Sequence, residues 1–335
     1  MKRRKFSKYL AIGGLSLTGI GYSFLLSCKR NHTELRNEQN NVVIRNKKVT
    51  VILDKKGKGK IISFIDNNTG QEFVAQSSTS ELFRLGLSEP EDKSGDMNWI
   101  TNLDAGNVNY STEENEIQKT VNLTFSDFDR LHLKVRCSVS VSSENDLILW
   151  RFSLEGKDSL ILEEVCYPMV TMRAPLSDKD ISSFVSGQNR GGKYTSPDQW
   201  EKGRGLVLTH PGSLAAQFSC YYDACCGFYS ATQDNKGYPK RLQFIRTDSG
   251  LEYIWKHYCY HNLLKPFNLD YPVAMTTFRS ENPDISTNWC DAADIYKAWA
   301  LKQPFCAKTI AERDNLPAWL KKGFAMVKFR RKLTY

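Results

Sequence analysis

Short segments in which apolar and polar residues alternate fill the chain from residue 43 to about residue 277. Alternation with a period of two is typical of strands that have one buried face. The clearest segments are residues 49–53, 61–65, 121–125, 131–135, 147–152 and 206–208, with turn chemistry at 66–70, 143–146 and 234–237. This region is too long for an immunoglobulin-like module of about 100 residues. The pattern predicts a mainly β protein with a large two-sheet antiparallel β-sandwich over residues 43–284.

A helical period replaces the alternation near the end of the chain. The residues Ala292, Ile295, Tyr296 and Trp299 follow one face of a helix. Asn288 is a suitable N-cap, and Asp291 complements the dipole of the first turn. A second helical pattern contains Trp319 and ends near Gly323. We therefore expect a helical connector over residues 285–323.

A mostly apolar run at residues 324–329 directly follows this connector. The passage from a helix into a buried strand is typical of the start of an α/β domain. Residues 324–335 are therefore predicted to begin a barrel domain that is truncated after one strand. Without that domain, we expect the sandwich to leave the aromatic residues of the connector poorly buried, namely Trp289, Trp299, Phe305 and Trp319.

The N-terminus has the pattern of an export signal over residues 1–28. Five basic residues precede a glycine-diluted apolar run, and the segment from Leu25 to Cys28 resembles a lipobox. Arg3 and Arg4 lie in a segment similar to a twin-arginine signal. The alternative is an uncleaved membrane anchor. We expect an exported, periplasmic or cell-surface lipoprotein anchored to the membrane through a lipid on Cys28, with residues 29–42 as a polar tether.

Charge argues against a nucleic-acid partner. The formal net charge is +9, but the five basic residues of the signal contribute to it without any acidic residue nearby, and the rest of the chain carries +4. The remaining Lys and Arg residues are mostly scattered among Asp and Glu, so no basic groove is indicated.

Eight cysteines remain besides Cys28, and none of them form a CxxC pair. Most lie in apolar segments, which favours buried free thiols, although one or two disulfides are compatible with an oxidising compartment.

The sharpest metal-like pattern is the alternation of His257, Cys259 and His261, which would share one face of a regular strand. A fourth ligand for zinc is not evident. Together with Trp255, the segment is better interpreted as an aromatic-rich core strand. No metal and no cofactor are therefore expected.

A long polar loop at residues 188–200 contains Arg190, Tyr194 and Trp200. Aromatic faces beside hydrogen-bonding groups suit sugar rings, and long loops in compact domains are often functional. We predict carbohydrate contacts at Arg190, Tyr194, Trp200, Trp255 and His257. The alternative is that the loop packs on an adjoining domain. Acidic neighbours such as Glu163 and Glu164 do not resemble a glycosidase pair, whose carboxylates face each other across a ring. No catalytic residues are predicted.

Several segments resemble uncharacterised bacterial glycoside-hydrolase-like lipoproteins, in which a galactose-mutarotase-like β-supersandwich precedes a TIM barrel. These segments are residues 59–70, 210–213, 228–234, 289–300 and 312–320. The resemblance spans roughly residues 45–329 and implies an accessory sandwich whose catalytic barrel is absent from this chain. It leaves enzyme activity uncertain, because the family's acid and nucleophile belong to barrel strands.

Three functions remain open from the sequence. The first is the accessory sandwich domain of an exported glycoside-hydrolase-like protein that acts on carbohydrate. The second is a non-catalytic carbohydrate-binding or structural surface lipoprotein, with an oligosaccharide or polysaccharide as partner. The third is a mutarotase-type enzyme, in which His210, His257 or His261 would act with Glu252 or Glu163.

Overall fold

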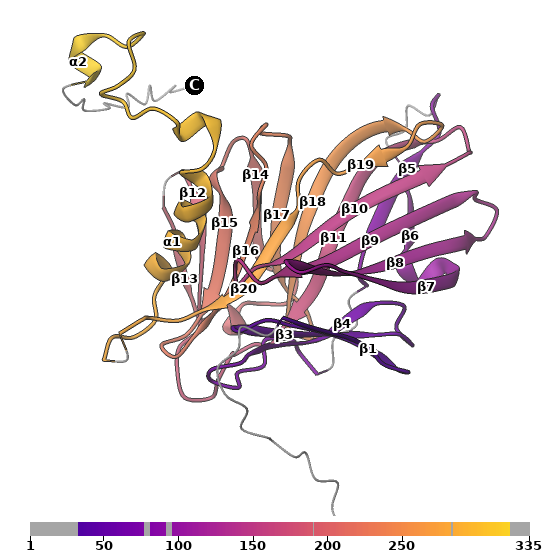
Figure 1. The fold of residues 1–335 in the computed structure, drawn as a ribbon, viewed down its shortest axis with the longest axis horizontal. Helices are drawn as coiled ribbons and strands as arrows, with labels where there is room; N and C mark the ends of the chain where they lie inside the picture. The colour runs from indigo at the N-terminus through magenta and orange to yellow at the C-terminus, as the bar shows by residue number, and fades with distance from the viewer. Residues whose placement is uncertain (1–32, 77–80, 92–95, 190, 283, 322–335) are drawn as a thin grey trace, which may run out of the picture. The chain divides into compact units, whose positions relative to one another are not determined.

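The computed structural model describes residues 33–76, 81–91, 96–189, 191–282 and 284–321, apart from the side chain of Leu320. Three antiparallel sheets form the framework of this region (Figure 1). The predicted mainly β class and antiparallel sandwich are therefore confirmed. The export signal at residues 1–28 and the strand expected at 324–329 lie outside the described residues.

The smallest sheet has four strands, in the order β1 (Glu34–Asn37), β2 (Asn41–Arg45), β3 (Val49–Asp54) and β4 (Lys60–Asp66). Its first strand corrects the expected tether, because residues 34–37 pair with β2. Leu35 is opposite Ile44 and is buried with it in the core, although its neighbours along the strand are polar. A single inward apolar side chain on an edge strand gives too short an alternation to detect in the sequence.

The largest sheet carries ten strands. In sheet order they are β13 (Lys193–Thr195), β12 (Ser183–Gln188), β15 (Leu214–Tyr222), β16 (Gly227–Thr232), β20 (Val273–Phe278), β10 (Ile148–Gly156), β9 (Leu133–Ser142), β8 (Gln118–Phe128) and β7 (Ala105–Glu114), and β19 (Phe267–Asn268) pairs with β10. The six-stranded sheet runs β14 (Gly205–His210), β17 (Lys240–Arg246), β18 (Leu251–Asn262), β11 (Ile161–Met172), β5 (Arg84–Ser88) and β6 (Asn98–Thr101).

One hydrophobic core joins all three sheets. Phe184 of the ten-stranded sheet stacks on Phe244 of the six-stranded sheet, with ring centroids 4.1 Å apart. Trp150 and Trp255 are also fully buried in this core. The two large sheets therefore pack face to face, as the alternation predicted. One predicted strand begins late: Leu131 and His132 precede β9, because Asp127 and Arg130 adopt positive φ angles in the turn before it.

The connector contains α1 (Trp289–Ala300), a three-residue 3-10 turn at Pro304–Cys306 and α2 (Ala318–Lys321). Two more such turns lie earlier in the chain, at Asn102–Asp104 and Pro197–Gln199. The predicted cap is confirmed, since the Asn288 side chain accepts the backbone N–H of Cys290. Helix α1 covers the outer side of the ten-stranded sheet, where Tyr296 stacks on Phe218 at 5.1 Å (Figure 1).

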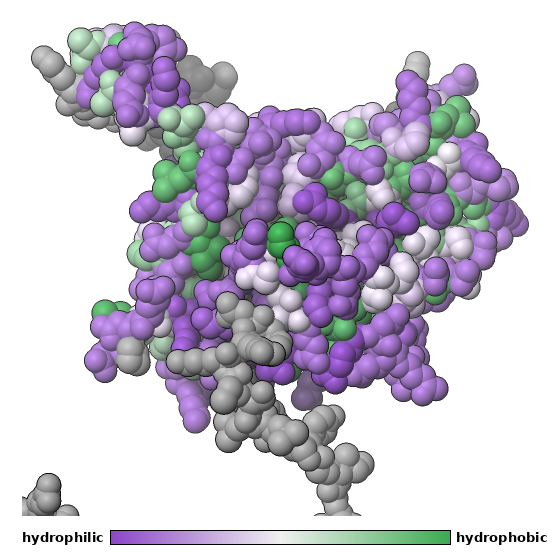
Figure 2. Space-filling model, in the orientation of Figure 1, coloured by the Kyte–Doolittle hydropathy of each residue, from purple (hydrophilic) through white to green (hydrophobic). Residues whose placement is uncertain are grey.

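Large apolar side chains of the connector are exposed at the start of α1 and beyond it, as expected, whereas Trp299 is half-buried and contacts the rings of Tyr296 and Phe305. Trp289 is 44% exposed, Phe305 46% and Trp319 64%. In the described residues no helix combines the length and apolar character that a membrane span requires. Figure 2 shows hydrophilic residues over most of the visible face, with apolar residues in small groups between them. The eight cysteines from Cys137 to Cys306 are free thiols, although Cys225 and Cys290 are exposed rather than buried.

Candidate functional site

A hollow of about 340 Å³ opens at the end of β18, beside the loop that carries β19. We call it the tyrosine pocket. Its lining consists of Tyr238, Tyr258, Cys259, His261, Pro266, Phe267, Asn268, Leu269, Asp270 and Tyr271. Other hollows occur near α1 and in the 304–315 segment, but neither contains a tyrosine in its lining. The tyrosine pocket combines aromatic faces with a few polar groups, as small-molecule sites usually do.

A β-bulge in β18 shapes the first wall of the pocket. Leu162 of β11 is opposite His261, whereas Glu164 is opposite Tyr258, so β18 contains one extra residue between these pairs. Tyr260 in this bulge has a φ of 46°. Because a bulge bends a strand and breaks its alternation, the residues on either side of it can face the same hollow.

The loop that forms the opposite wall is anchored to the sandwich at both ends. The Leu263 N–H donates to the Leu160 carbonyl at 2.9 Å, and the Leu269 N–H donates to the Phe152 carbonyl at 3.0 Å. Between them, Phe267 pairs with Leu154 of β10. The pocket is thus built on strand-bonded backbone, which keeps its aromatic walls in place without a ligand.

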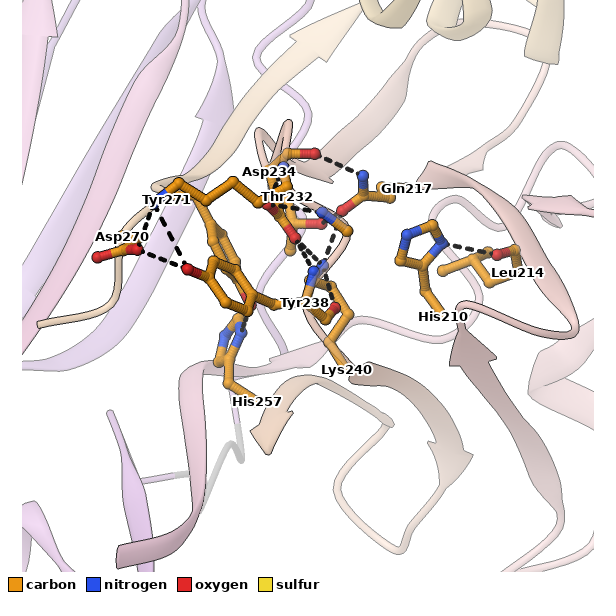
Figure 3. Close-up of polar contacts among 12 residues, drawn as sticks. His210, Leu214, Gln217, Thr232, Asp234, Tyr238, Lys240, His257, Asp270 and Tyr271 are labelled. Carbon is orange, nitrogen blue, oxygen red and sulfur yellow. Dashed lines mark hydrogen bonds and ion pairs between the residues drawn. The ribbon is translucent and has the colours of Figure 1, made fainter. Parts of the chain in front are cut away.

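Asp270 supplies the carboxylate of the pocket. Its Oδ2 accepts hydrogen bonds from Lys236 Nζ at 2.8 Å and from the Tyr238 hydroxyl at 2.9 Å (Figure 3). The bond from Lys236, followed by that from Tyr238, lowers the pKa of Asp270. Both bonds use Oδ2, so among the described residues Oδ1 has no hydrogen-bond partner and can accept one from a ligand.

A buried ion pair beneath the pocket holds the turn that carries Tyr238. Lys240 Nζ lies 2.6 Å from Asp234 Oδ2, and both side chains are almost completely buried (Figure 3). Lys240 also donates to Gln217 Oε1 at 2.9 Å. The Asp234 carboxylate accepts the backbone N–H groups of Lys236, Gly237 and Tyr238. These bonds confirm the turn predicted at 234–237 and leave Asp234 saturated, so its role is structural.

His257 lies behind the pocket and is held neutral. Its Nε2 is 2.9 Å from the Tyr167 carbonyl, which can only accept, so Nε2 carries the proton. Its Nδ1 then accepts the hydrogen bond from the Tyr271 hydroxyl at 2.9 Å (Figure 3). Burial lowers the pKa of His257 to about 4. Both nitrogens are therefore occupied, and neither can exchange a proton with a ligand.

The acid–base pairs considered for a mutarotase are not assembled. Glu252 lies five positions from His257 on β18, on the opposite face and about 16 Å away at the rise of a strand. Glu163 accepts a hydrogen bond from Ser88, while His261 Nε2 is bonded to the Lys265 carbonyl at 3.0 Å. His210 Nδ1 donates to the Leu214 carbonyl, and burial lowers its pKa.

The predicted contacts at Trp255 and His257 are wrong. Both side chains point into the core, with exposures of 0% and 1%, and Trp255 Nε1 donates to Ser230 Oγ at 2.9 Å. Trp255 and His257 lie on the same face of β18, as the alternation predicted, but this face is turned toward the core. The bulge also removes the regular geometry that the metal-like pattern at 257–261 required. The described residues contain no group of three His, Cys, Asp or Glu side chains suited to a metal ion.

The loop aromatics Tyr194 and Trp200 do come together, with ring centroids 6.2 Å apart. Trp200 also packs on Phe244 of the core, at 6.1 Å, and the Tyr194 hydroxyl is bonded to Gln188. The loop therefore packs on its own sandwich, and both rings remain half-buried. Arg190 lies outside the described residues.

Sequence reasoning missed Tyr238, Tyr258, Phe267, Asp270 and Tyr271 as site residues. Their one visible signal is local density: Tyr258 and Tyr260 flank Cys259, and the 266–271 loop adds two aromatics, an amide and an acid. This signal does not predict that Tyr238, which belongs to a different turn, lines the same pocket.

A scan of protein-family models and a search of curated proteins find no match to this chain. Solved structures do match. The α-N-acetylgalactosaminidase NagBb from Bifidobacterium bifidum is 8% identical with a TM-score of 0.54, over 83% of this chain and 40% of that protein. The galactosidase domain of the α-galactosidase–sucrose kinase AgaSK is 6% identical with a TM-score of 0.50, over 73% and 41%.

A galactose mutarotase-like protein from Clostridium acetobutylicum matches at 8% identity with a TM-score of 0.48, over 74% of this chain and 99% of that protein. At such identities, the two glycosidase matches establish a shared fold. The chain spans 40% of the length of NagBb, so the likeness is to part of that enzyme.

Proposed function

We propose that this chain is a carbohydrate-binding accessory sandwich of a glycoside-hydrolase-like protein, and that the tyrosine pocket holds a sugar ring. The observation that carries the proposal is the pairing of aromatic walls with the Asp270 carboxylate in one hollow. Sugar rings have apolar C–H faces and hydroxylated edges, so this combination matches both surfaces of the ligand.

The pocket suits binding better than catalysis. Glycosidases need two facing carboxylates, and Asp270 is the one carboxylate in the pocket lining. The nearby imidazole of His257 is sealed by two hydrogen bonds. We therefore assign recognition to this domain and place any hydrolysis in a separate barrel. That both glycosidase matches cover about two fifths of the other chain supports this division.

A glycan array followed by calorimetry on the binding glycans tests the proposal. Phe267→Ala and Tyr258→Ala each remove one aromatic wall, and we expect affinity to fall roughly two- to tenfold for each lost ring contact. Tyr260→Ala is the matched control, because Tyr260 lies on the same strand, is 74% exposed and does not line the pocket.

Two results would contradict the proposal. If the mature chain binds no glycan on the array, the proposed carbohydrate binding is refuted. Equal loss of affinity in Tyr260→Ala and Phe267→Ala, or a loss confined to Trp200→Ala, moves the site away from the tyrosine pocket.

Export and lipid attachment are part of the same proposal. They are supported by the basic and apolar segments before Cys28 and by the lipobox-like sequence at 25–28. Cys28→Ala should shift the chain from the membrane fraction to the soluble fraction, whereas unchanged membrane association would favour an uncleaved anchor. A catalytic barrel encoded next to this chain is tested by reading the downstream DNA for repeated strand–helix units.

A further inference from the structure

Arg241 lies beside Tyr258, one wall of the tyrosine pocket, on the outer face of the six-stranded sheet. On β17, Lys240 points inward to Asp234, so the next residue, Arg241, points outward. Its guanidinium carbon lies 5.4 Å from the ring centroid of Tyr258, one of the pocket walls. Because the guanidinium contacts the Tyr258 ring, a ligand that contacts the same ring lies near the guanidinium.

Three lysines on β17, on β18 and in the turn before β17 are each paired with a carboxylate. Lys236 neutralises Asp270 at 2.8 Å, Lys256 neutralises Glu164 at 2.5 Å, and Lys240 neutralises Asp234 at 2.6 Å. Arg241 differs from these lysines, since no ion pair joins it to a carboxylate in the described parts of the chain.

The Nε of Arg241 is buried and has no hydrogen-bond partner among the described residues. A buried N–H without an acceptor is costly, and such groups are rare in folded proteins. Stacking on Tyr258 orients the planar guanidinium but supplies no acceptor for its N–H groups. The arrangement therefore leaves a preoriented cation that lacks an anionic partner.

From this geometry we infer that the sugar recognised at the tyrosine pocket is acidic, and that Arg241 binds its carboxylate or sulfate group. Guanidinium groups bind planar carboxylates and sulfur or phosphorus oxyanions through paired N–H donors, which gives specificity as well as affinity. The inference rests on the proposed function and narrows it to uronic-acid-bearing or sulfated glycans.

Matched probes that differ only in charge test this inference on the mature chain. The first pair is trigalacturonate and its methyl ester, and the second is a sulfated galactose disaccharide and its unsulfated form. We expect the acidic member of at least one pair to bind about tenfold more tightly, as one charge-assisted contact predicts, with the preference shrinking in high salt. The pair that shows the preference identifies the anionic group.

Arg241→Gln should abolish this preference while keeping the affinity for the neutral probe, and Arg241→Lys should restore only part of it. Lys202→Gln is the control, because Lys202 is an exposed lysine paired with Asp248. Unchanged neutral-probe binding and thermal midpoint show that Arg241→Gln is folded.

The outcomes separate the two proposals. Equal binding of acidic and neutral probes by the parent chain overturns the inference and leaves the proposed function standing. A preference that survives in Arg241→Gln overturns the assignment to Arg241. Failure of every probe to bind, neutral or acidic, counts against the proposed function itself.

Discussion

Acidification should destabilise the folded chain through the buried imidazole of His257. The side chain is 1% exposed, donates to the Tyr167 carbonyl and accepts from the Tyr271 hydroxyl. Protonation of Nδ1 would break the present bond, since the Tyr271 hydroxyl donates to Nδ1 and would have to turn its own proton away. Burial, the largest cause, lowers the pKa of His257 to about 4.

The direction and size of the effect follow from linkage. In the unfolded chain His257 has an ordinary pKa of about 6.5, so between pH 6.5 and 4 the unfolded state binds more protons than the folded state. The stability contribution of His257 is thus fully present above about pH 6.5 and is lost as the pH falls to about 4. Each pKa unit corresponds to about 1.4 kcal/mol, so a pKa difference of about 2.5 lowers the free energy of unfolding by about 3 kcal/mol.

Denaturant unfolding from about pH 7.5 to about pH 4 measures this loss when the parent chain is compared with His257→Gln. Glutamine can donate to Tyr167 and accept from Tyr271 but does not titrate in this range. Other groups with shifted pKa values, such as His210 and Glu252, are shared by both chains and cancel in the difference. Parallel pH profiles for the two chains would refute the buried, neutral state of His257.

Two further substitutions test the buried ion pair beneath the pocket and the N-cap of α1. Lys240→Met should cost about 3–5 kcal/mol of unfolding free energy because it strands the buried Asp234 carboxylate, whereas Lys202→Met in the exposed pair with Asp248 should cost less than about 1 kcal/mol. Denaturant titration checks both, and equal losses would contradict the argument. Asn288→Ala removes the N-cap of α1 and should cost about 1 kcal/mol, with Asn288→Asp nearly neutral; no loss in Asn288→Ala would mean that the cap does not stabilise the helix.

The sequence pattern was sufficient for the class of fold and for the connector helix. Alternation is a property of each strand by itself, so segments such as 49–53 could be recognised without knowing their partners. The N-cap at Asn288 is equally local. The strand at 34–37 was missed because its burial depends on pairing with β2 and on one side chain, Leu35.

The site could not be predicted in the same way, because it depends on strand order and on a one-residue irregularity. Tyr238 and Asp270 are far apart in sequence and meet only where the 234–238 turn lies beside the loop after β19. The bulge at Tyr260 changes which residues face the hollow, and no turn residue marks it in the sequence.

The period of two nevertheless explains why the predicted and observed sites lie on opposite sides of one strand. Trp255 and His257 share the inner face of β18, so Tyr258 must take the outer one. What decides between the faces is an anchor on the neighbouring strand: Lys240 is opposite His257 and is tied inward by Asp234, which turns Arg241 outward beside Tyr258. With Lys240 and His257 both directed inward, Tyr258 is left on the other face, where it lines the tyrosine pocket.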